Sequence, residues 1–141
     1  MVTIPWAKLH GASTHFPIAL VLAAFAFEVG AMACWSKPIA RQLSSAGRYA
    51  MTLGALGSVA AVVSGLFLTK GSIWGSGDLG WHHRFVWPAF GLIIAAATWR
   101  LLAGENLSRK SYAGYVGVLV LAVGLISASG YFGGEMLQHL P

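Results

Sequence analysis

Four long apolar segments constrain the fold of this chain more than any other feature of its sequence. They cover about residues 16–35, 49–69, 81–103 and 112–131. A helix of ~20 residues rises by ~30 Å, which matches the hydrocarbon thickness of a bilayer. Only 9% of the 141 residues are charged, whereas a soluble domain carries about 25%. The sequence therefore predicts an all-α transmembrane four-helix bundle that forms a single membrane domain over residues 1–141.

Composition excludes several other classes of protein. The apolar runs are continuous rather than alternating, which argues against the strands of a membrane barrel. The net charge of +5 comes from scattered basic residues near the span ends, so we expect no nucleic-acid partner. The single cysteine, Cys34, excludes an internal disulfide and a cysteine-based metal cluster. The lipid bilayer is the one partner that the composition requires, and a homo-oligomer is left open.

The segments between the spans predict the orientation. Residues 1–14 are expected to lie in the membrane interface and residues 36–48 to form a loop. Pro17 is expected in the first turn of the first helix, capped by Ser13 or Thr14. With four spans, both termini lie on one side, and six of the nine basic residues lie on the other: Lys37, Arg41, Arg48, Arg100, Arg109 and Lys110, against Lys8, Lys70 and Arg84. Because basic residues accumulate on the cytoplasmic side, both termini are predicted to face outward, to the periplasm from a bacterial inner membrane.

All five histidines fall on the predicted outer side. Two precede the first span, two open the third and one follows the fourth: His10, His15, His82, His83 and His139. Haem iron takes axial imidazoles from facing helices, and a helix N-terminus disfavours a protonated ring, which keeps the imidazole available to a metal. Nearby cations, Arg84 among them, would suit the propionates of a haem. We therefore predict one haem b, or two, near the outer face.

The favoured axial ligands of the haem iron are His15 and His83. His10 and His82 are candidates for a second pair or for hydrogen bonds to the first, and His139 is a further alternative ligand. His10 lies five residues before His15, so one regular helix would place the two rings on different faces.

Two further features leave alternatives open. Glu28 lies inside the first span, where it could bind a quinone or relay a proton, or be protonated or paired with Arg48 or Arg100. Small residues form stripes in the second and fourth spans, which allow close packing of helices or of a helix against a porphyrin. These stripes are Gly54, Gly57, Ala61 and Gly65, and Gly117, Gly124, Ser127 and Gly130.

Two motifs near the chain ends are residues 14–20 (Thr-His-Phe-Pro-Ile-Ala-Leu) and residues 130–137 (Gly-Tyr-Phe-Gly-Gly-Glu-Met-Leu). Together they resemble an uncharacterised family of small four-span bacterial membrane proteins, a domain of unknown function. The resemblance matches family histidines to His15, to His139 and to His82 or His83, where the tandem pair leaves the match ambiguous. His10 also matches an upstream histidine that is often seen in the family. Some family members are joined to c-type cytochromes, so the resemblance implies a role in redox chemistry.

The leading hypothesis is an integral-membrane b-type cytochrome that transfers electrons between quinone and a periplasmic cytochrome or other redox-complex subunits. No nucleophile–base arrangement suggests hydrolysis, so an electron-transfer protein is favoured over a stand-alone enzyme. Two alternatives stay open: a cofactor-free membrane anchor subunit of a redox complex, and a membrane protein in which the histidines bind copper or zinc.

Overall fold

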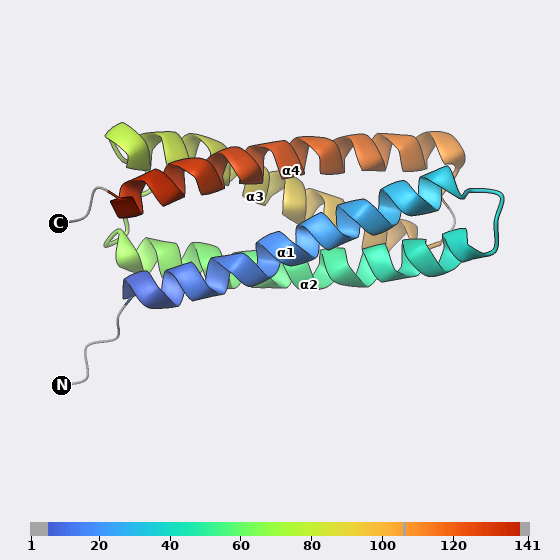
Figure 1. Cartoon of the computed structure of the whole chain (residues 1–141), viewed down its shortest axis with the longest axis horizontal. Helices are drawn as coiled ribbons and strands as arrows, with labels where there is room; N and C mark the ends of the chain where they lie inside the picture. Colours follow the sequence, from blue (N-terminus) through green and yellow to red (C-terminus); the bar gives the residue numbers. More distant parts are fainter. Residues whose placement is uncertain (1–5, 106, 139–141) are drawn as a thin grey trace.

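The computed structural model describes residues 6–105 and 107–138 as four long helices (Figure 1). They are α1 (Trp6–Ala33), α2 (Ile39–Leu68), α3 (Gly77–Ala103) and α4 (Arg109–Gln138). Each helix is long and apolar enough to cross a membrane. The predicted all-α fold with four spans is therefore confirmed.

All four helices begin before the predicted spans, and the difference is largest in the first half of the chain. α1 begins at Trp6, whereas the apolar run begins at residue 16. The predicted loop over residues 36–48 is wrong, because α2 begins at Ile39 and the turn occupies only residues 34–38. Polar residues with good helix propensity continue a helix beyond the lipid. Hydropathy therefore marks the part of a helix that lies in the bilayer, and not the residue where the helix begins.

Pro17 lies in the interior of α1, so its predicted place in a first helical turn is wrong. It has no N–H to donate to the carbonyl of Ser13. Ser13 and Thr14 do not cap the helix as predicted, because their hydroxyls donate to the carbonyls of His10 and Gly11 within α1. The segment that carries the first two histidines is thus helical, and this fixes the directions of both side chains.

The bundle consists of two antiparallel helix pairs, α1 with α2 and α3 with α4, which pack more extensively within a pair than between pairs. The start of α1 and the end of α4 lie at the same end of the bundle (Figure 1). We call this the histidine end; it comprises residues 6–19, 58–91 and 127–138. The opposite end, with residues 28–48, 97–105 and 107–116, is the ionic end.

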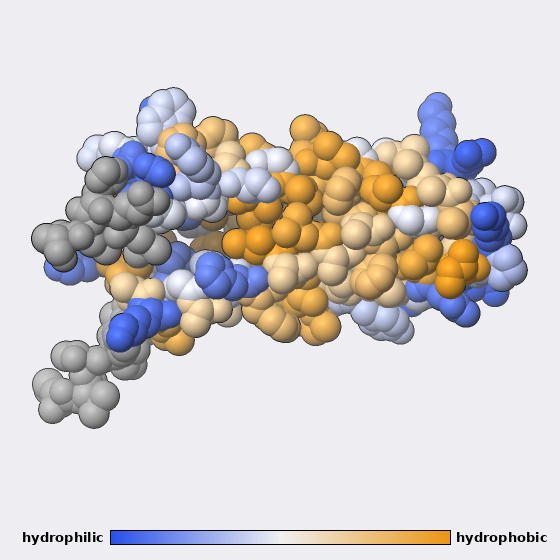
Figure 2. Space-filling model, viewed as in Figure 1, coloured by the Kyte–Doolittle hydropathy of each residue, from blue (hydrophilic) through white to orange (hydrophobic). Residues whose placement is uncertain are grey.

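The hydrophobic core fills the middle of the bundle and the ionic end. Its buried members are Val21, Ala24, Ala31, Ala50, Met51, Ala55, Ile93, Ala96, Ala97, Tyr112, Tyr115, Val116, Leu119 and Ala122. At the histidine end the described buried residues are small or polar instead, among them Ser58, Ala61, Ser64, His83, Ala89 and Ser129. Figure 2 shows a hollow between the two helix pairs at this end, whereas the surface is closed over the middle. Apolar packing therefore holds the pairs together at one end more than at the other.

The two predicted stripes of small residues have different surroundings. In α2, a Cβ added at Gly54, Gly57 or Gly65 would lie 3.0 or 3.1 Å from a side chain of α1. In α4, a Cβ added at Gly117 or Gly124 would meet nothing within 4 Å. The stripe of α2 therefore allows the close approach of α1, and these two glycines of α4 face outward.

Candidate histidine site and a buried ionic cluster

His10 of α1 packs against α2. Its Nδ1 lies 3.0 Å from the hydroxyl of Ser64, which in turn lies 3.0 Å from the hydroxyl of Ser13. Gly65 permits this approach, since a Cβ there would lie 3.0 Å from Cε1 of His10. The Nε2 atom of His10 has no hydrogen-bond partner among the described residues. The ring is thus held through one nitrogen and leaves the other free.

His82 of α3 is held by α4 in the same manner. Its Nδ1 lies 2.8 Å from the carbonyl oxygen and 3.1 Å from the hydroxyl of Ser129. A carbonyl oxygen only accepts, so Nδ1 carries the proton and Nε2 keeps its lone pair. A Cβ on Gly133 would lie 3.3 Å from Nδ1, so a glycine again makes room for the ring. This is the tautomer that a metal ligand needs.

His83, beside His82, is buried, and its Nδ1 has no hydrogen-bond partner among the described residues. The centroid of its ring lies 5.8 Å from that of His82 and 6.2 Å from that of Trp87. His82 lies close enough to both His83 and His10 to interact electrostatically with them. His82 and His83 of the second pair are therefore neighbours, and His10 of the first pair lies at the same end of the bundle.

The other predicted ligands lie elsewhere. His15 is exposed and has no hydrogen-bond partner among the described residues. It lies five residues after His10 in α1, so the two rings are on different faces of the helix, as their spacing predicts. Arg84 is also exposed and lies 4.7 Å above the ring of Trp81, with which it lines a pocket of about 220 Å³. His139 lies outside the described residues. The predicted group of ligands is thus divided between a cluster and the surface.

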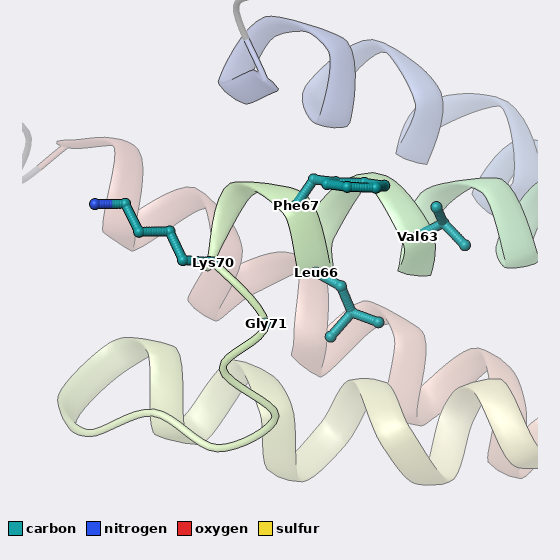
Figure 3. Close-up of a pocket in the computed structure, with 5 residues that line it drawn as sticks. All are labelled: Val63, Leu66, Phe67, Lys70 and Gly71. Atoms are coloured by element: carbon teal, nitrogen blue, oxygen red, sulfur yellow. The ribbon is translucent and has the colours of Figure 1, made fainter.

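A groove of about 390 Å³ lies at the last turns of α2 and is lined by Val63, Leu66, Phe67, Lys70 and Gly71 (Figure 3). In Figure 3, Leu66 points toward α3 and Lys70 extends away from the end of the helix. The walls are mainly apolar, and none of the described histidines lines them. The groove is therefore separate from the histidine cluster.

A charged cluster lies inside the ionic end. Glu28 of α1 is 0% exposed and Arg100 of α3 is 2% exposed. Nε of Arg100 donates to Oε1 of Glu28 at 3.3 Å, and its other nitrogens donate to the hydroxyl of Ser44 and the carbonyl of Gly104. The hydroxyl of Tyr112 donates to Oε2 of Glu28. Side chains from all four helices therefore join one hydrogen-bonded cluster.

The predicted alternative in which Glu28 pairs with Arg100 is confirmed. Arg48 forms no ion pair with Glu28; it pairs instead with Glu105 at 3.6 Å. Sequence reasoning missed the tyrosine of this cluster. Tyr112 lies at the start of the fourth predicted span, and its hydroxyl reaches Glu28 from there.

Tyr115 lies one turn further along α4 and contacts the same cluster. The Cζ of Arg100 lies 5.9 Å from the centroid of the Tyr115 ring and 5.7 Å from that of Tyr112. The hydroxyl of Tyr115 is buried without a hydrogen-bond partner among the described residues. Its spacing of three from Tyr112 places both rings on one face of α4, a signal that the sequence did contain.

The described helices and their apolar surfaces define a four-span, all-helical membrane protein. Residues 7–140 match a family described as predicted membrane proteins (DUF2231), and the chain belongs to that family. The predicted resemblance to an uncharacterised membrane family is thereby confirmed. No curated protein and no solved structure matches the chain significantly.

Proposed function

We propose that the protein is a b-type cytochrome of the bacterial inner membrane that binds haem between its helix pairs at the histidine end. The arrangement of two imidazoles carries this proposal. His10 and His82 belong to different pairs, and each has Nδ1 held by Ser64 or Ser129 while Nε2 is free. Histidines that bind a metal usually have their second nitrogen fixed by a hydrogen bond in this manner.

The contacts favour His10 and His82 as the axial ligands, the combination that the sequence placed second. His83 is a third candidate, because a bound group could supply the partner that its buried Nδ1 lacks. His15 stays a predicted ligand on the strength of its motif alone. Because the His15 ring is exposed, His15→Ala is the best comparison for substitutions of His10 and His82 in a mutational test.

The surroundings of the imidazoles fit a flat cofactor that is largely apolar. The hydrophobic core does not extend to the histidine end, and a hollow lies between the helix pairs there (Figure 2). Bound haem would supply one-electron redox chemistry. The chain would orient the rings through its serines and exclude water with its helices. Arg84 stays the predicted partner of a propionate, although it now lies over Trp81.

The proposed orientation has both termini outward. Arg100 is paired with Glu28 inside the bundle, so its charge contributes little to the orientation. The basic residues near the ionic end still outnumber those near the histidine end: Lys37, Arg41, Arg48, Arg109 and Lys110, against Lys8, Lys70 and Arg84. The haem would then lie near the periplasmic face, where electrons could pass between quinone and a periplasmic cytochrome.

The two alternative functions differ in what they require of the histidines. Among the described residues, no group of three or more His, Cys, Asp or Glu could hold a metal ion, which disfavours a copper or zinc site. A haem needs only axial ligands from the protein, because the porphyrin supplies the rest. A cofactor-free anchor subunit is the second candidate, since His10 and His82 each form a hydrogen bond between helices of one pair.

Optical spectroscopy of the purified protein tests the proposal. The protein is expressed in a haem-replete host, and the reduced-minus-oxidised spectrum and the molar ratio of haem to protein are measured. We expect a b-type spectrum that is lost in His10→Ala and in His82→Ala and retained in His15→Ala. Circular dichroism and size-exclusion chromatography verify that each variant folds.

The other outcomes are equally informative. A colourless protein that contains stoichiometric copper or zinc would support the metal site, and a colourless metal-free protein would support the anchor. Loss of haem in His15→Ala and His83→Ala, with retention in His10→Ala and His82→Ala, would assign the ligands to the pair that the sequence analysis favours. Ser64→Ala should weaken haem binding by about 10-fold, because Nδ1 of His10 loses the hydroxyl that fixes it. Ser129→Ala should have a smaller effect, because the backbone carbonyl of residue 129 still accepts from Nδ1 of His82.

A further inference from the structure

The described hydrogen bonds and ion pairs that join helices of different pairs lie at the ionic end. Glu28 of α1 bonds to Arg100 and Tyr112, which belong to the second pair. Beside them, Ser45 and Arg48 of α2 contact Glu105, which follows α3. The ionic end therefore ties the two pairs together through buried and surface contacts.

The polar contacts at the histidine end stay within each pair. His10 bonds to Ser64 across the first pair, and His82 bonds to Ser129 across the second. The hydrophobic core shows the same asymmetry, because it ends before this region. The hollow in Figure 2 separates the two pairs in the same region. The attachment between the pairs is thus strong at one end and weak at the other.

The ionic cluster has the properties of a fixed point. Both oxygens of Glu28 and all three side-chain nitrogens of Arg100 take part in hydrogen bonds. A Cβ on Gly47 would lie 2.7 Å from Cγ of Glu28, which shows how closely α2 is seated against the cluster. Trp35 adds an edge contact to Tyr112, with ring centroids 5.1 Å apart. Breaking a buried, fully bonded ion pair is strongly unfavourable.

The connection between the pairs at the histidine end can change its shape. Residues 69–76 join α2 to α3, and positive φ angles occur at Lys70, Gly71 and Gly77 in or beside this segment. One side-chain bond from α3 reaches the segment, from Nε1 of Trp87 to the carbonyl of Ile73 at 2.9 Å. The other described hydrogen bonds of the segment lie within it or join it to the adjoining turns of α2 and α3. Glycine tolerates a wide range of backbone angles, so the segment can follow a movement of the helices.

We infer that the bundle is a clamp, in which the two helix pairs are fixed at the ionic cluster and part at the histidine end. His10 and Glu28 are 18 residues apart in α1, which corresponds to a lever of roughly 27 Å at 1.5 Å per residue. A rotation of about 10° at the ionic cluster would move the histidine end by roughly 5 Å over this lever. Parting of the pairs opens the space between His10 and His82 to a ligand, and closure brings the imidazoles together.

Spin-label distances measured in nanodiscs on the haem-free protein test this inference. The native cysteine is replaced in Cys34→Ser, and nitroxides are attached at exposed sites on α2 and α4. The variant pair Ala60→Cys and Ser127→Cys reports on the histidine end. The pair Gln42→Cys and Ser111→Cys reports on the ionic end.

We expect a narrow distance distribution at the ionic end and one that is broader by roughly 5 Å at the histidine end. Equal widths at the two ends would overturn the inference. Tyr112→Phe removes one bond of the cluster and should broaden the ionic-end distribution, with Tyr115→Phe as the matched control. An unchanged ionic-end width in Tyr112→Phe would mean that the cluster does not fix the pairs. These distances need no haem, so a colourless protein that parts in this way would refute the cytochrome and leave the clamp.

Discussion

Replacing Gly47 by alanine tests how tightly the ionic cluster is packed. The added Cβ would lie 2.7 Å from Cγ and 2.8 Å from both Cδ and Oε1 of Glu28. Carbon atoms pack best at about 3.5–4.0 Å, so the overlap approaches about 1 Å. Glu28 cannot move aside freely, because Arg100 and Tyr112 hold its two oxygens.

The energetic terms for Gly47→Ala have opposite signs. Alanine gains up to about 1 kcal/mol over glycine in helix propensity. Overpacking costs about 1–3 kcal/mol, and loosening the buried ion pair adds part of the about 3–5 kcal/mol that its full loss would cost. We expect a net decrease of roughly 2 kcal/mol in the free energy of unfolding.

Unfolding of Gly47→Ala by sodium dodecyl sulfate in mixed micelles, followed by circular dichroism, measures this change. Gly117→Ala is the matched control, because a Cβ there meets nothing within 4 Å. We expect the control to be unchanged or more stable by up to about 1 kcal/mol. If Gly47→Ala were as stable as Gly117→Ala, the close seating of α2 against Glu28 would be refuted.

Three further predictions concern buried groups and use the same unfolding assay or the haem ratio. Tyr115→Phe should leave the stability unchanged or raise it, since the Tyr115 hydroxyl has no described partner. Tyr112→Phe should lower the free energy of unfolding by about 1.5–3 kcal/mol, because it removes a hydrogen bond to Glu28. Equal effects of the two substitutions would contradict this bonding pattern. Arg100→Met should lower the free energy of unfolding by about 3–5 kcal/mol, because it leaves Glu28 buried without its partner. Adding Glu28→Met should recover much of that stability, because no unpaired charge is then left buried. Additive losses of stability in the double variant would argue against the ion pair. Gly65→Ala should lower the haem ratio, since its Cβ would lie 3.0 Å from the imidazole that packs on it; a wild-type ratio would argue against that packing.

The four-helix fold could be predicted from the sequence because lipid permits few structures. Continuous apolar runs of ~20 residues have to be helices, since every backbone group in hydrocarbon needs an internal partner. The helix ends could not be predicted by the same reasoning. Beyond the lipid this constraint disappears, and the polar residues after Ile39 continue α2 where a loop was expected.

The candidate site was predictable in part. The spacing of His10 and His15 predicted different faces if one helix carried both, but the sequence showed neither that α1 begins at Trp6 nor which face turns inward. That choice depends on Ser64 and Gly65, which lie in another helix and receive the ring of His10. The contact of Tyr112 with Glu28 is hidden for the same reason, because it joins residues from the two ends of the chain.

The two polar regions of the bundle differ in how completely their groups are bonded. Glu28 and Arg100 carry the charges that would mark a functional site inside a membrane, yet they are paired with each other and bonded to neighbouring side chains of the bundle. The histidines carry no obligatory charge, yet Nδ1 of His83 is buried without a hydrogen-bond partner among the described residues. In an apolar environment an unused donor or acceptor is costly, so its retention calls for a partner from outside the chain. Each end keeps one such buried atom, Nδ1 of His83 at the histidine end and the hydroxyl of Tyr115 at the ionic end. The imidazole lies beside a second histidine, so we propose ligand binding at the histidine end and a structural role for the ion pair of the ionic end.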